Sequence, residues 1–132
     1  MLNFDLTEDH RLLERSVREW AANEVAPRIH DLDRAHQFDR GILPQMAELG
    51  LLGISVPAEY GGAGMDYIAL GLASEELEYV DTSLRVIMSV HAGLNCLTLL
   101  SWGTEDQKQR YLVPQAQGKK IATYGLTEQI GR

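Results

Sequence analysis

The longest apolar pattern in the chain runs from Asp81 to Trp102 and predicts one central helix. Asp81 has a side chain that accepts from the free N–H groups of a first turn. Gly103, which follows the stretch, can end a helix in the left-handed conformation. Apolar residues stand on nearly every side between these ends: Leu84, Val86, Ile87, Met88, Val90, Leu94, Leu97, Leu99 and Leu100. A helix that is apolar all round is buried all round, so we expect it at the centre of a bundle.

The length of this helix also fits a membrane span, but its polar residues favour a soluble bundle. Polar side chains interrupt the apolar run, and no basic flank orients it across a bilayer. These side chains are Arg85, Ser89, His91, Asn95 and Thr98. Because buried polar groups need hydrogen-bond partners, we expect specific contacts from them.

Shorter amphipathic patterns predict further helices before and after the central one. Each begins near a residue that can cap a helix: Thr7, Asp39, Asp66 and Thr104. Pro27 must kink the first of these helices or begin a new one, because it has no N–H and crowds the preceding turn. One helix is predicted to run from Tyr67 to about Val80, and the last to end at Val113 or Gln117.

After Lys120 the helical pattern gives way to a strand-like one, Ile121-Ala122-Thr123-Tyr124-Gly125-Leu126-Thr127. A single strand cannot satisfy its own backbone hydrogen-bonding groups. We therefore expect an all-α domain over residues 1–120 and, over residues 121–132, the first strand of a β-domain that the chain does not complete.

The net charge of the chain limits which classes of molecule it is expected to bind. The 132 residues include 12 lysines and arginines against 19 aspartates and glutamates, a net charge of −7, which argues against nucleic acids and anionic membranes as partners. The single Cys96 cannot form an internal disulfide, and the N-terminus shows no secretory signal. We expect a soluble protein of the cytoplasm or, in a eukaryote, of the mitochondrial matrix.

Two polar or glycine-rich clusters have a chemical interpretation and a structural one. The glycine-rich run 60–64 either cradles a phosphate or forms a tight turn, and it lacks the GxGxxG spacing. A second cluster either ligates a metal or is simply hydrated at a helix end: His30, Asp31, Asp33 and His36. In both cases the structural interpretation is the one we expect, so no metal ligands are assigned.

Acidic residues before the central helix offer candidate bases. Glu75, Glu76 and Glu78 follow the face opposite the apolar stripe, so we expect solvent beside them rather than the apolar pocket of a general base. We assign no catalytic residue.

Two polar residues within the central helix are more informative. His91 is expected to be a core histidine with its hydrogen bonds satisfied. Arg85 either reaches solvent or a carboxylate such as Glu78 or Asp81, or points into a cavity, where it would anchor a substrate carboxylate. Ser89, one turn further on, would face the same cavity.

Several short motifs, taken together and in order, resemble the acyl-CoA dehydrogenases. They are Phe4-Asp5-Leu6-Thr7-Glu8, Glu48-Leu49-Gly50-Leu51-Leu52-Gly53, Val56-Pro57-Ala58-Glu59-Tyr60-Gly61-Gly62-Ala63-Gly64, Glu75-Glu76-Leu77 with Val80-Asp81, Gly103-Thr104-Glu105-Asp106-Gln107-Lys108-Gln109-Arg110-Tyr111-Leu112, and Tyr124-Gly125-Leu126-Thr127-Glu128. The resemblance implies the N-terminal helical domain of a flavoenzyme whose middle β-domain and C-terminal helical bundle follow, usually in a homotetramer.

The same resemblance implies an activity. FAD oxidises the Cα–Cβ bond of an acyl-CoA thioester, a glutamate base removes the α-proton, and electrons pass to an electron-transfer flavoprotein. Tyr124, Leu126 and Thr127 occupy the positions that contact the flavin in this family. The central helix would line the acyl pocket.

Part of the central helix is similar to the glutaryl-CoA dehydrogenase subgroup. Val80-Asp81, Arg85 and Met88-Ser89-Val90 carry this similarity. It implies that Arg85 and Ser89 hold the far carboxylate of a dicarboxylyl-CoA, for which bidentate arginine geometry is suited. His91 stands where the subgroup usually has Gln.

The end of the chain departs from the family pattern. The family continues after the Thr-Glu pair with Pro and an Ala-Gly-Ser-Asp run, whereas residues 129–132 read Gln-Ile-Gly-Arg. The glutamate base and most of the flavin site belong to parts that this sequence lacks. The leading hypothesis is an acyl-CoA dehydrogenase fragment that is inactive alone. The alternatives are a stand-alone helical interaction module and one half of a split enzyme.

Overall fold

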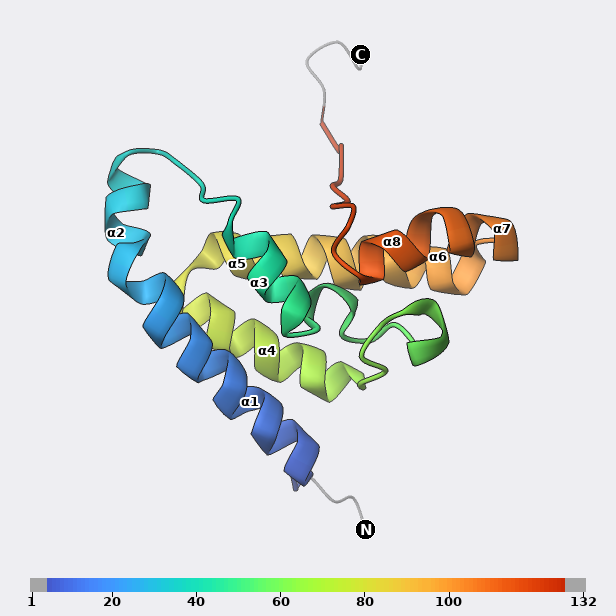
Figure 1. The fold of residues 1–132 in the computed structure, drawn as a ribbon, viewed down its shortest axis with the longest axis horizontal. Coiled ribbons are helices and arrows are strands. Elements are labelled where there is room, and N and C mark those ends of the chain that lie inside the picture. The colour runs from blue at the N-terminus through green and yellow to red at the C-terminus, as the bar shows by residue number, and fades with distance from the viewer. Residues whose placement is uncertain (1–4, 128–132) are drawn as a thin grey trace.

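The computed structural model describes residues 5–127, and every regular element within them is a helix, as expected. The elements are α1 (Glu8–Trp20), η1 (Ala21–Val25), α2 (Ala26–Arg34), α3 (Ile42–Glu48), η2 (Leu51–Gly53), η3 (Ala58–Tyr60), α4 (Tyr67–Val80), α5 (Thr82–Met88), η4 (Ser89–Cys96), α6 (Leu97–Trp102), α7 (Glu105–Gln107), η5 (Lys108–Leu112) and α8 (Val113–Ala116). Helix α4 packs against α1 and α5, and the last helical stretch lies along α6 (Figure 1).

Side-chain caps fix where four of the described helices begin: α1, α4, α5 and α7. The Thr7 hydroxyl accepts from the His10 N–H at 3.2 Å, the Asp66 carboxylate from the Ala69 N–H at 2.9 Å, and the Thr104 hydroxyl from the Gln107 N–H at 3.3 Å. Asp81 caps α5 in the same way. Asp39 instead accepts from the Gly41 N–H, and so stabilises the turn that leads into α3. The caps predicted at Thr7, Asp66, Asp81 and Thr104 are therefore confirmed, whereas the cap predicted at Asp39 is wrong, because Gly41 is the N-cap of α3.

Turns of π-helix join the pieces of the long helices. η1 connects α1 to α2, η4 connects α5 to α6, and η5 connects α7 to α8. Pro27 stands at the beginning of α2, where a missing N–H costs little, because the π turn before it takes up the irregularity. The predicted disturbance at Pro27 is therefore a wider turn within a continuous helix.

The central helix, Thr82–Trp102, is less buried than we expected. This helix is long and apolar enough to cross a membrane, a property that core helices of soluble proteins share. Only 28% of its most apolar window is buried. Val86 and Leu94 are 40% and 41% exposed, and Trp102 is 84% exposed. The expectation of burial on every side was wrong, because α4, η2 and α8 cover only part of the helix.

The core divides into two clusters. The larger one lies where α1, α4 and α5 meet, and its fully buried members include Val17, Leu77 and Leu84. The smaller cluster joins the central helix to the last one: Val56, Cys96, Leu112 and Ala116. The second cluster holds the last helix against the central helix near Cys96.

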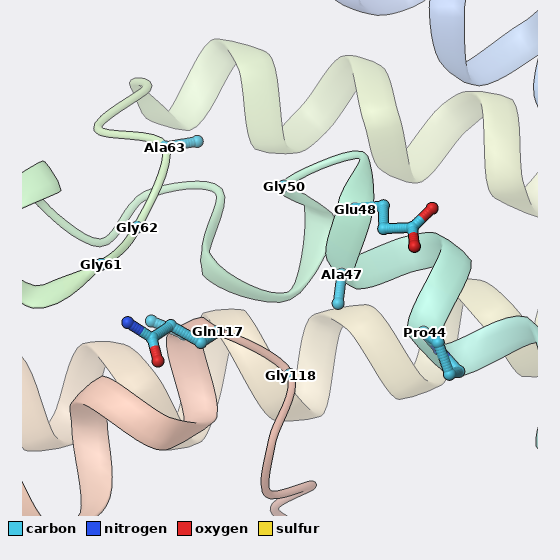
Figure 2. A pocket seen from close by; sticks show the side chains of 10 residues that line it. Pro44, Ala47, Glu48, Gly50, Gly61, Gly62, Ala63, Gln117 and Gly118 are labelled. Atoms are coloured by element: carbon cyan, nitrogen blue, oxygen red, sulfur yellow. The ribbon is translucent and has the colours of Figure 1, made fainter.

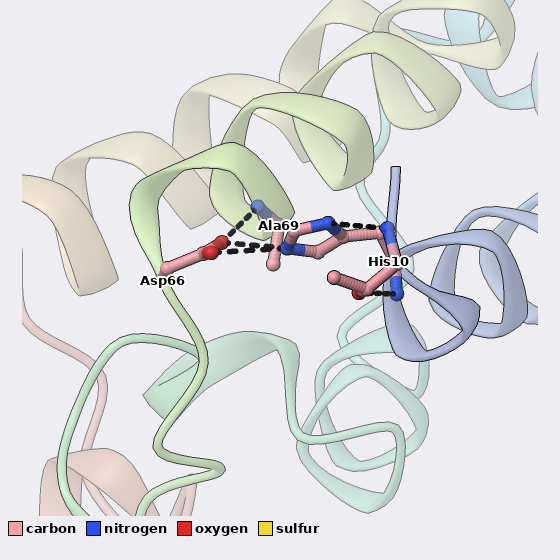
Figure 3. A network of polar contacts seen from close by, with 4 residues as sticks. His10, Asp66 and Ala69 are labelled. Atoms are coloured by element: carbon pink, nitrogen blue, oxygen red, sulfur yellow. Dashed lines mark hydrogen bonds and ion pairs between the residues drawn. The ribbon is translucent and has the colours of Figure 1, made fainter. Parts of the chain in front are cut away.

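A polar network ties the start of α1 to the start of α4 (Figure 3). The Thr7 N–H donates to Nδ1 of His10, so the imidazole proton lies on Nε2, which donates to the Asp66 carboxylate at 2.9 Å. The hydrogen bond from the Ala69 N–H, with that from His10, lowers the pKa of Asp66 below its ordinary value. Sequence analysis missed this network, although a histidine three residues after an N-cap threonine matches the spacing of a capping box.

The chain leaves the helices after α8 and projects away from them (Figure 1). Residues 121–127 contain no strand, so the strand expected from residue 121 is not formed in the described part. A strand is stable only when it pairs with another strand, and the described residues contain no second strand. The division into domains at residue 120 stays a prediction.

Candidate functional site

The predicted flavin residues lie on the exposed C-terminal segment. Tyr124 is 56% exposed and Leu126 is 76% exposed, and Thr127 is exposed as well. Among the described residues, the backbone N–H groups of these three have no hydrogen-bond partner. Their donors and side chains are therefore available to a ligand, and whether they contact flavin stays a prediction.

Tyr124 closes one side of a cavity of about 510 Å³ against the central helix. The lining residues come from the central helix, the last helix and the C-terminal segment: Leu94, Asn95, Thr98, Leu99, Tyr111, Gln115 and Tyr124. Leucine and tyrosine side chains supply apolar walls, and amide and hydroxyl groups supply a few polar contacts. Such a lining suits a flat aromatic ring or a short acyl chain. We call this cavity the Tyr124 groove.

The lining of the Tyr124 groove fits part of a flavin. The aromatic rings of Tyr111 and Tyr124 can pack on an isoalloxazine, and Asn95, Thr98 and the free N–H groups of the C-terminal segment can hydrogen-bond its edge. These residues cover one side of such a ring only. Flavin binding in this groove stays a prediction.

Arg85 forms an ion pair with Glu78, and its role in substrate binding stays a prediction. Its Nε donates to the Glu78 carboxylate at 2.7 Å, and the Thr82 hydroxyl donates to the same carboxylate at 2.9 Å. The hydrogen bond from Arg85, followed by that from Thr82, lowers the pKa of Glu78. Of the alternatives left open for Arg85, a carboxylate partner is the one that the structure shows. With 35% of its side chain exposed, the guanidinium remains accessible from solvent.

Ser89 follows Arg85 by one turn, and its hydroxyl donates to the Val86 carbonyl at 3.1 Å. The structure does not bring this pair to the Tyr124 groove. Arg85 precedes Asn95 by ten residues, about 15 Å along a helix at about 1.5 Å per residue. The predicted substrate residues and the helix residues that line the Tyr124 groove thus occupy two places on the central helix.

His91 is a core histidine with both ring nitrogens satisfied, as expected. It is fully buried, and its Nε2 and Nδ1 lie 3.0 Å from the Gln115 carbonyl and 3.0 Å from the Ala122 N–H. Burial lowers the pKa of its imidazole, and the hydrogen bond to Gln115 offsets part of this effect. The neutral form is therefore the one present at physiological pH.

Glu76 contradicts the expectation that the acidic residues of α4 face solvent. Glu75 and Glu78 are exposed, but Glu76 is only 8% exposed. Arg18 on α1 donates to both of its carboxylate oxygens, from Nε at 3.0 Å and from Nη2 at 2.6 Å. The periodicity of α4 predicted the apolar side correctly, but it could not show that α1 crosses beside Glu76 and supplies a bidentate partner.

The glycine-rich run 60–64 is a tight turn. The N–H groups of Gly61, Gly62, Ala63 and Gly64 all donate to carbonyls between residues 53 and 58. A phosphate cradle needs such groups free, so the structural interpretation is confirmed. The run borders a cavity of about 540 Å³, with α3 and the end of the last helix as its other walls (Figure 2). This cavity contains none of the predicted site residues. The cluster that was expected to be hydrated at a helix end has exposed side chains: His30, Asp31, Asp33 and His36.

Comparison with known proteins places the chain in a family of enzymes. Residues 7–119 match the family described as acyl-CoA dehydrogenase, N-terminal domain. A short-chain specific acyl-CoA dehydrogenase from Clostridium acetobutylicum is 42% identical over 127 residues, which cover 96% of this chain and 34% of that protein. The chain therefore belongs to the acyl-CoA dehydrogenase family, and it corresponds to the N-terminal helical domain.

Solved structures agree with this assignment. Butyryl-CoA dehydrogenase from Megasphaera elsdenii matches with a TM-score of 0.92 and 28% identity, over 99% of this chain and 35% of that one. A glutaryl-CoA dehydrogenase from Mycobacterium smegmatis in complex with FADH2 matches with a TM-score of 0.82 and 28% identity, over 88% of this chain and 30% of that one. The chain spans about a third of the length of these relatives.

Proposed function

We propose that this chain supplies one wall of the active site of an FAD-dependent acyl-CoA dehydrogenase, an enzyme that introduces a Cα–Cβ double bond into an acyl-CoA thioester. The Tyr124 groove is the observation that carries the proposal, because it brings a predicted flavin residue against the central helix. The complex of the Mycobacterium smegmatis relative with FADH2 supports the choice of cofactor.

The residues of the chain would divide the work between cofactor and substrate. Tyr124, Leu126 and Thr127 would hold the flavin edge through their free backbone N–H groups and side chains. The exposed side of the central helix would line the acyl chain and exclude water from it. Bound FAD would accept hydride from Cβ. Because the family resemblance places the glutamate base in the C-terminal bundle, we expect no turnover from the 132 residues alone.

We propose a short acyl chain as the substrate. The names of two relatives support this choice, since one is a short-chain specific acyl-CoA dehydrogenase and the other a butyryl-CoA dehydrogenase. The Glu78–Arg85 ion pair also supports it, because it neutralises the cation that would otherwise attract a second substrate carboxylate.

A dicarboxylyl-CoA is the second candidate substrate, since a relative is a glutaryl-CoA dehydrogenase and Arg85 keeps two guanidinium nitrogens beyond the ion pair. The test uses an enzyme completed with the β- and C-terminal domains. If Arg85 anchors a carboxylate, Arg85→Ala lowers kcat/KM for glutaryl-CoA by about 10-fold or more relative to butyryl-CoA, the loss expected for a charged hydrogen bond. Equal losses for both substrates would exclude the anchor.

We propose that the partners are the remaining domains of the enzyme, further copies of it, and an electron-transfer flavoprotein. Apolar side chains left uncovered on the central helix support the first of these, because a domain interface needs such a surface. The family resemblance alone supports the electron-transfer flavoprotein.

Titration of the purified chain with FAD, followed by flavin absorbance and fluorescence, tests the flavin wall. We expect weak binding that Tyr124→Ala reduces about 10-fold, since stacking on an aromatic ring contributes roughly 1–1.5 kcal/mol. Tyr79→Ala is the matched control, because Tyr79 is 91% exposed on α4 and lies outside the groove. Binding that survives Tyr124→Ala unchanged would remove the Tyr124 groove from the flavin site.

If the isolated chain binds no FAD, the same titration is repeated after co-expression with the part of the Clostridium acetobutylicum relative that this chain does not cover. A flavin-loaded complex that oxidises butyryl-CoA supports the proposal. A folded complex without flavin contradicts it.

A further inference from the structure

His91 lies between two segments that follow it in the sequence by more than twenty residues. Its side chain is fully buried within the π turn η4. One ring nitrogen faces the carbonyl of Gln115 on α8, and the other faces the backbone N–H of Ala122 on the C-terminal segment. A single side chain thus joins the central helix, the last helix and the departing chain.

Hydrogen-bond chemistry decides which nitrogen carries the proton. The Ala122 N–H can only donate, so Nδ1 of His91 must accept, and the proton lies on Nε2. Nε2 then donates to the Gln115 carbonyl, which can only accept. Both contacts are satisfied together by one tautomer of the neutral ring, and by no other state of it.

Neighbouring contacts fix the chain on both sides of this point. The N–H groups of Lys119 and Lys120 donate to the Pro114 carbonyl, and Gly118, with φ of +70°, makes the turn that this requires. On the far side, the side-chain amide of Asn95 approaches the Thr123 carbonyl at 3.4 Å, a longer contact. The backbone is therefore held at Lys119, Lys120 and Ala122, and more loosely at Thr123.

The held residues stand directly before the predicted flavin segment. Ala122 precedes Tyr124 by two residues, which span at most about 7 Å of chain. Any shift of Ala122 therefore moves Tyr124 and the free N–H groups that follow it. The hydrogen bond that Nδ1 accepts from Ala122 is not needed to end the last helix, because the Gly118 turn and the contact between His91 and Gln115 already stabilise its C-terminus.

We propose that His91 is a positioning residue, which fixes through Nδ1 the point at which segment 121–127 leaves the helical domain and so sets where Tyr124, Leu126 and Thr127 stand. The first part of this inference, the position at which segment 121–127 leaves the helices, concerns the chain alone. The second part, the consequence for flavin, rests on the proposed function.

Three substitutions separate the two ring nitrogens. His91→Asn places an oxygen near the position of Nδ1 and keeps the acceptor for Ala122, whereas His91→Gln places its amide nitrogen near Nε2 and keeps only the donor to Gln115. His91→Leu removes both bonds and keeps an apolar side chain in the core. Leu84→Val is the matched control, because Leu84 is equally buried on the same helix but belongs to the larger core cluster.

The measurement is amide hydrogen exchange by NMR on the 132-residue chain, with the protection of Ala122 expressed relative to Ala73, a buried residue of α4. We expect His91→Gln and His91→Leu to lower this ratio about 5- to 10-fold, as loss of one hydrogen bond does, while His91→Asn and Leu84→Val leave it within about 2-fold. The ratio discounts a general loss of stability, which lowers both amides alike. Equal ratios in His91→Asn and His91→Gln would overturn the inference.

Flavin titration of the same variants tests the second part separately. In a chain or completed enzyme that binds FAD, we expect His91→Gln to weaken binding about 5-fold or more and His91→Asn to weaken it less, in the order of the Ala122 ratios. Lost protection of Ala122 with unchanged flavin affinity would overturn the second part only. Failure of the wild-type complex to bind FAD would overturn the proposed function and leave the exchange result standing.

Discussion

At the scale of single residues, His91 makes the stability of the chain depend on pH. Burial lowers the pKa of its imidazole in the folded state, whereas the unfolded chain takes up this proton near pH 6.5, at about the ordinary value. Below that pH the unfolded state binds more protons than the folded state, so stability falls as the pH falls. The contribution of the neutral ring is complete above about pH 6.5 and is lost towards the folded pKa.

Urea unfolding of the wild-type chain and of His91→Asn checks this sign. We expect the wild type to be the more stable of the two at about pH 7.5, and the difference to shrink as the pH falls below about 6.5, because only the wild type carries this titrating ring. The difference between the two proteins removes the contribution of the carboxylates, which is common to both. A difference that grows as the pH falls would contradict the lowered pKa.

Cys96 provides a second residue-scale prediction. Its thiol is fully buried, and burial raises its pKa to about 12. Since the thiolate is the reactive form, we expect the native chain to react with a chromogenic disulfide reagent at about pH 8 at least 100-fold more slowly than the chain in urea. Stopped-flow absorbance gives both rates. Similar rates with and without urea would show that Cys96 is accessible.

At the scale of elements, we expect replacement of two glycines by alanine to change the stability of the chain in opposite directions. A Cβ on Gly62 would lie 2.0 Å from the carbonyl oxygen of Val56, so Gly62→Ala forces the tight turn apart. We expect it to destabilise the chain by about 1–3 kcal/mol, the usual cost of overpacking. Gly71 is exposed on α4 with open space around it, and Gly71→Ala should stabilise by about 0.5–1 kcal/mol. Midpoints of urea unfolding measure both, and changes of the same sign would contradict the close approach at Gly62.

The elements also show what sequence reasoning can and cannot reach. Helix starts at Thr7, Asp66 and Thr104 were predicted correctly, because a cap depends on residues within three positions of it. The partner of Glu76 was missed, because Arg18 lies 58 positions away and only the packing of α1 on α4 brings it close. His91 was recognised as a satisfied core residue, but its partners come from segments that the helical pattern does not place.

At the scale of the whole molecule, the family assignment and the incomplete burial of the central helix have the same explanation. The sequence predicted a helix buried on every side, and the described residues cover only part of it. The relatives are about three times as long as this chain. The apolar pattern therefore fits the proposal that further protein packs on the uncovered sides of this helix.

The last prediction follows from that uncovered surface. Trp102 and Val86 remain 84% and 40% exposed, so we expect the purified chain to self-associate in the micromolar range, as exposed apolar patches do. Sedimentation velocity over a range of concentrations measures this. The double variant Val86→Glu, Trp102→Glu should shift the chain to monomer and raise the dissociation constant of self-association at least about 10-fold, because charges on the patch resist desolvation. Tyr79→Glu, on α4, is the control that should leave association unchanged. A wild-type chain that stays monomeric at high concentration would show that the uncovered side of the central helix needs no partner.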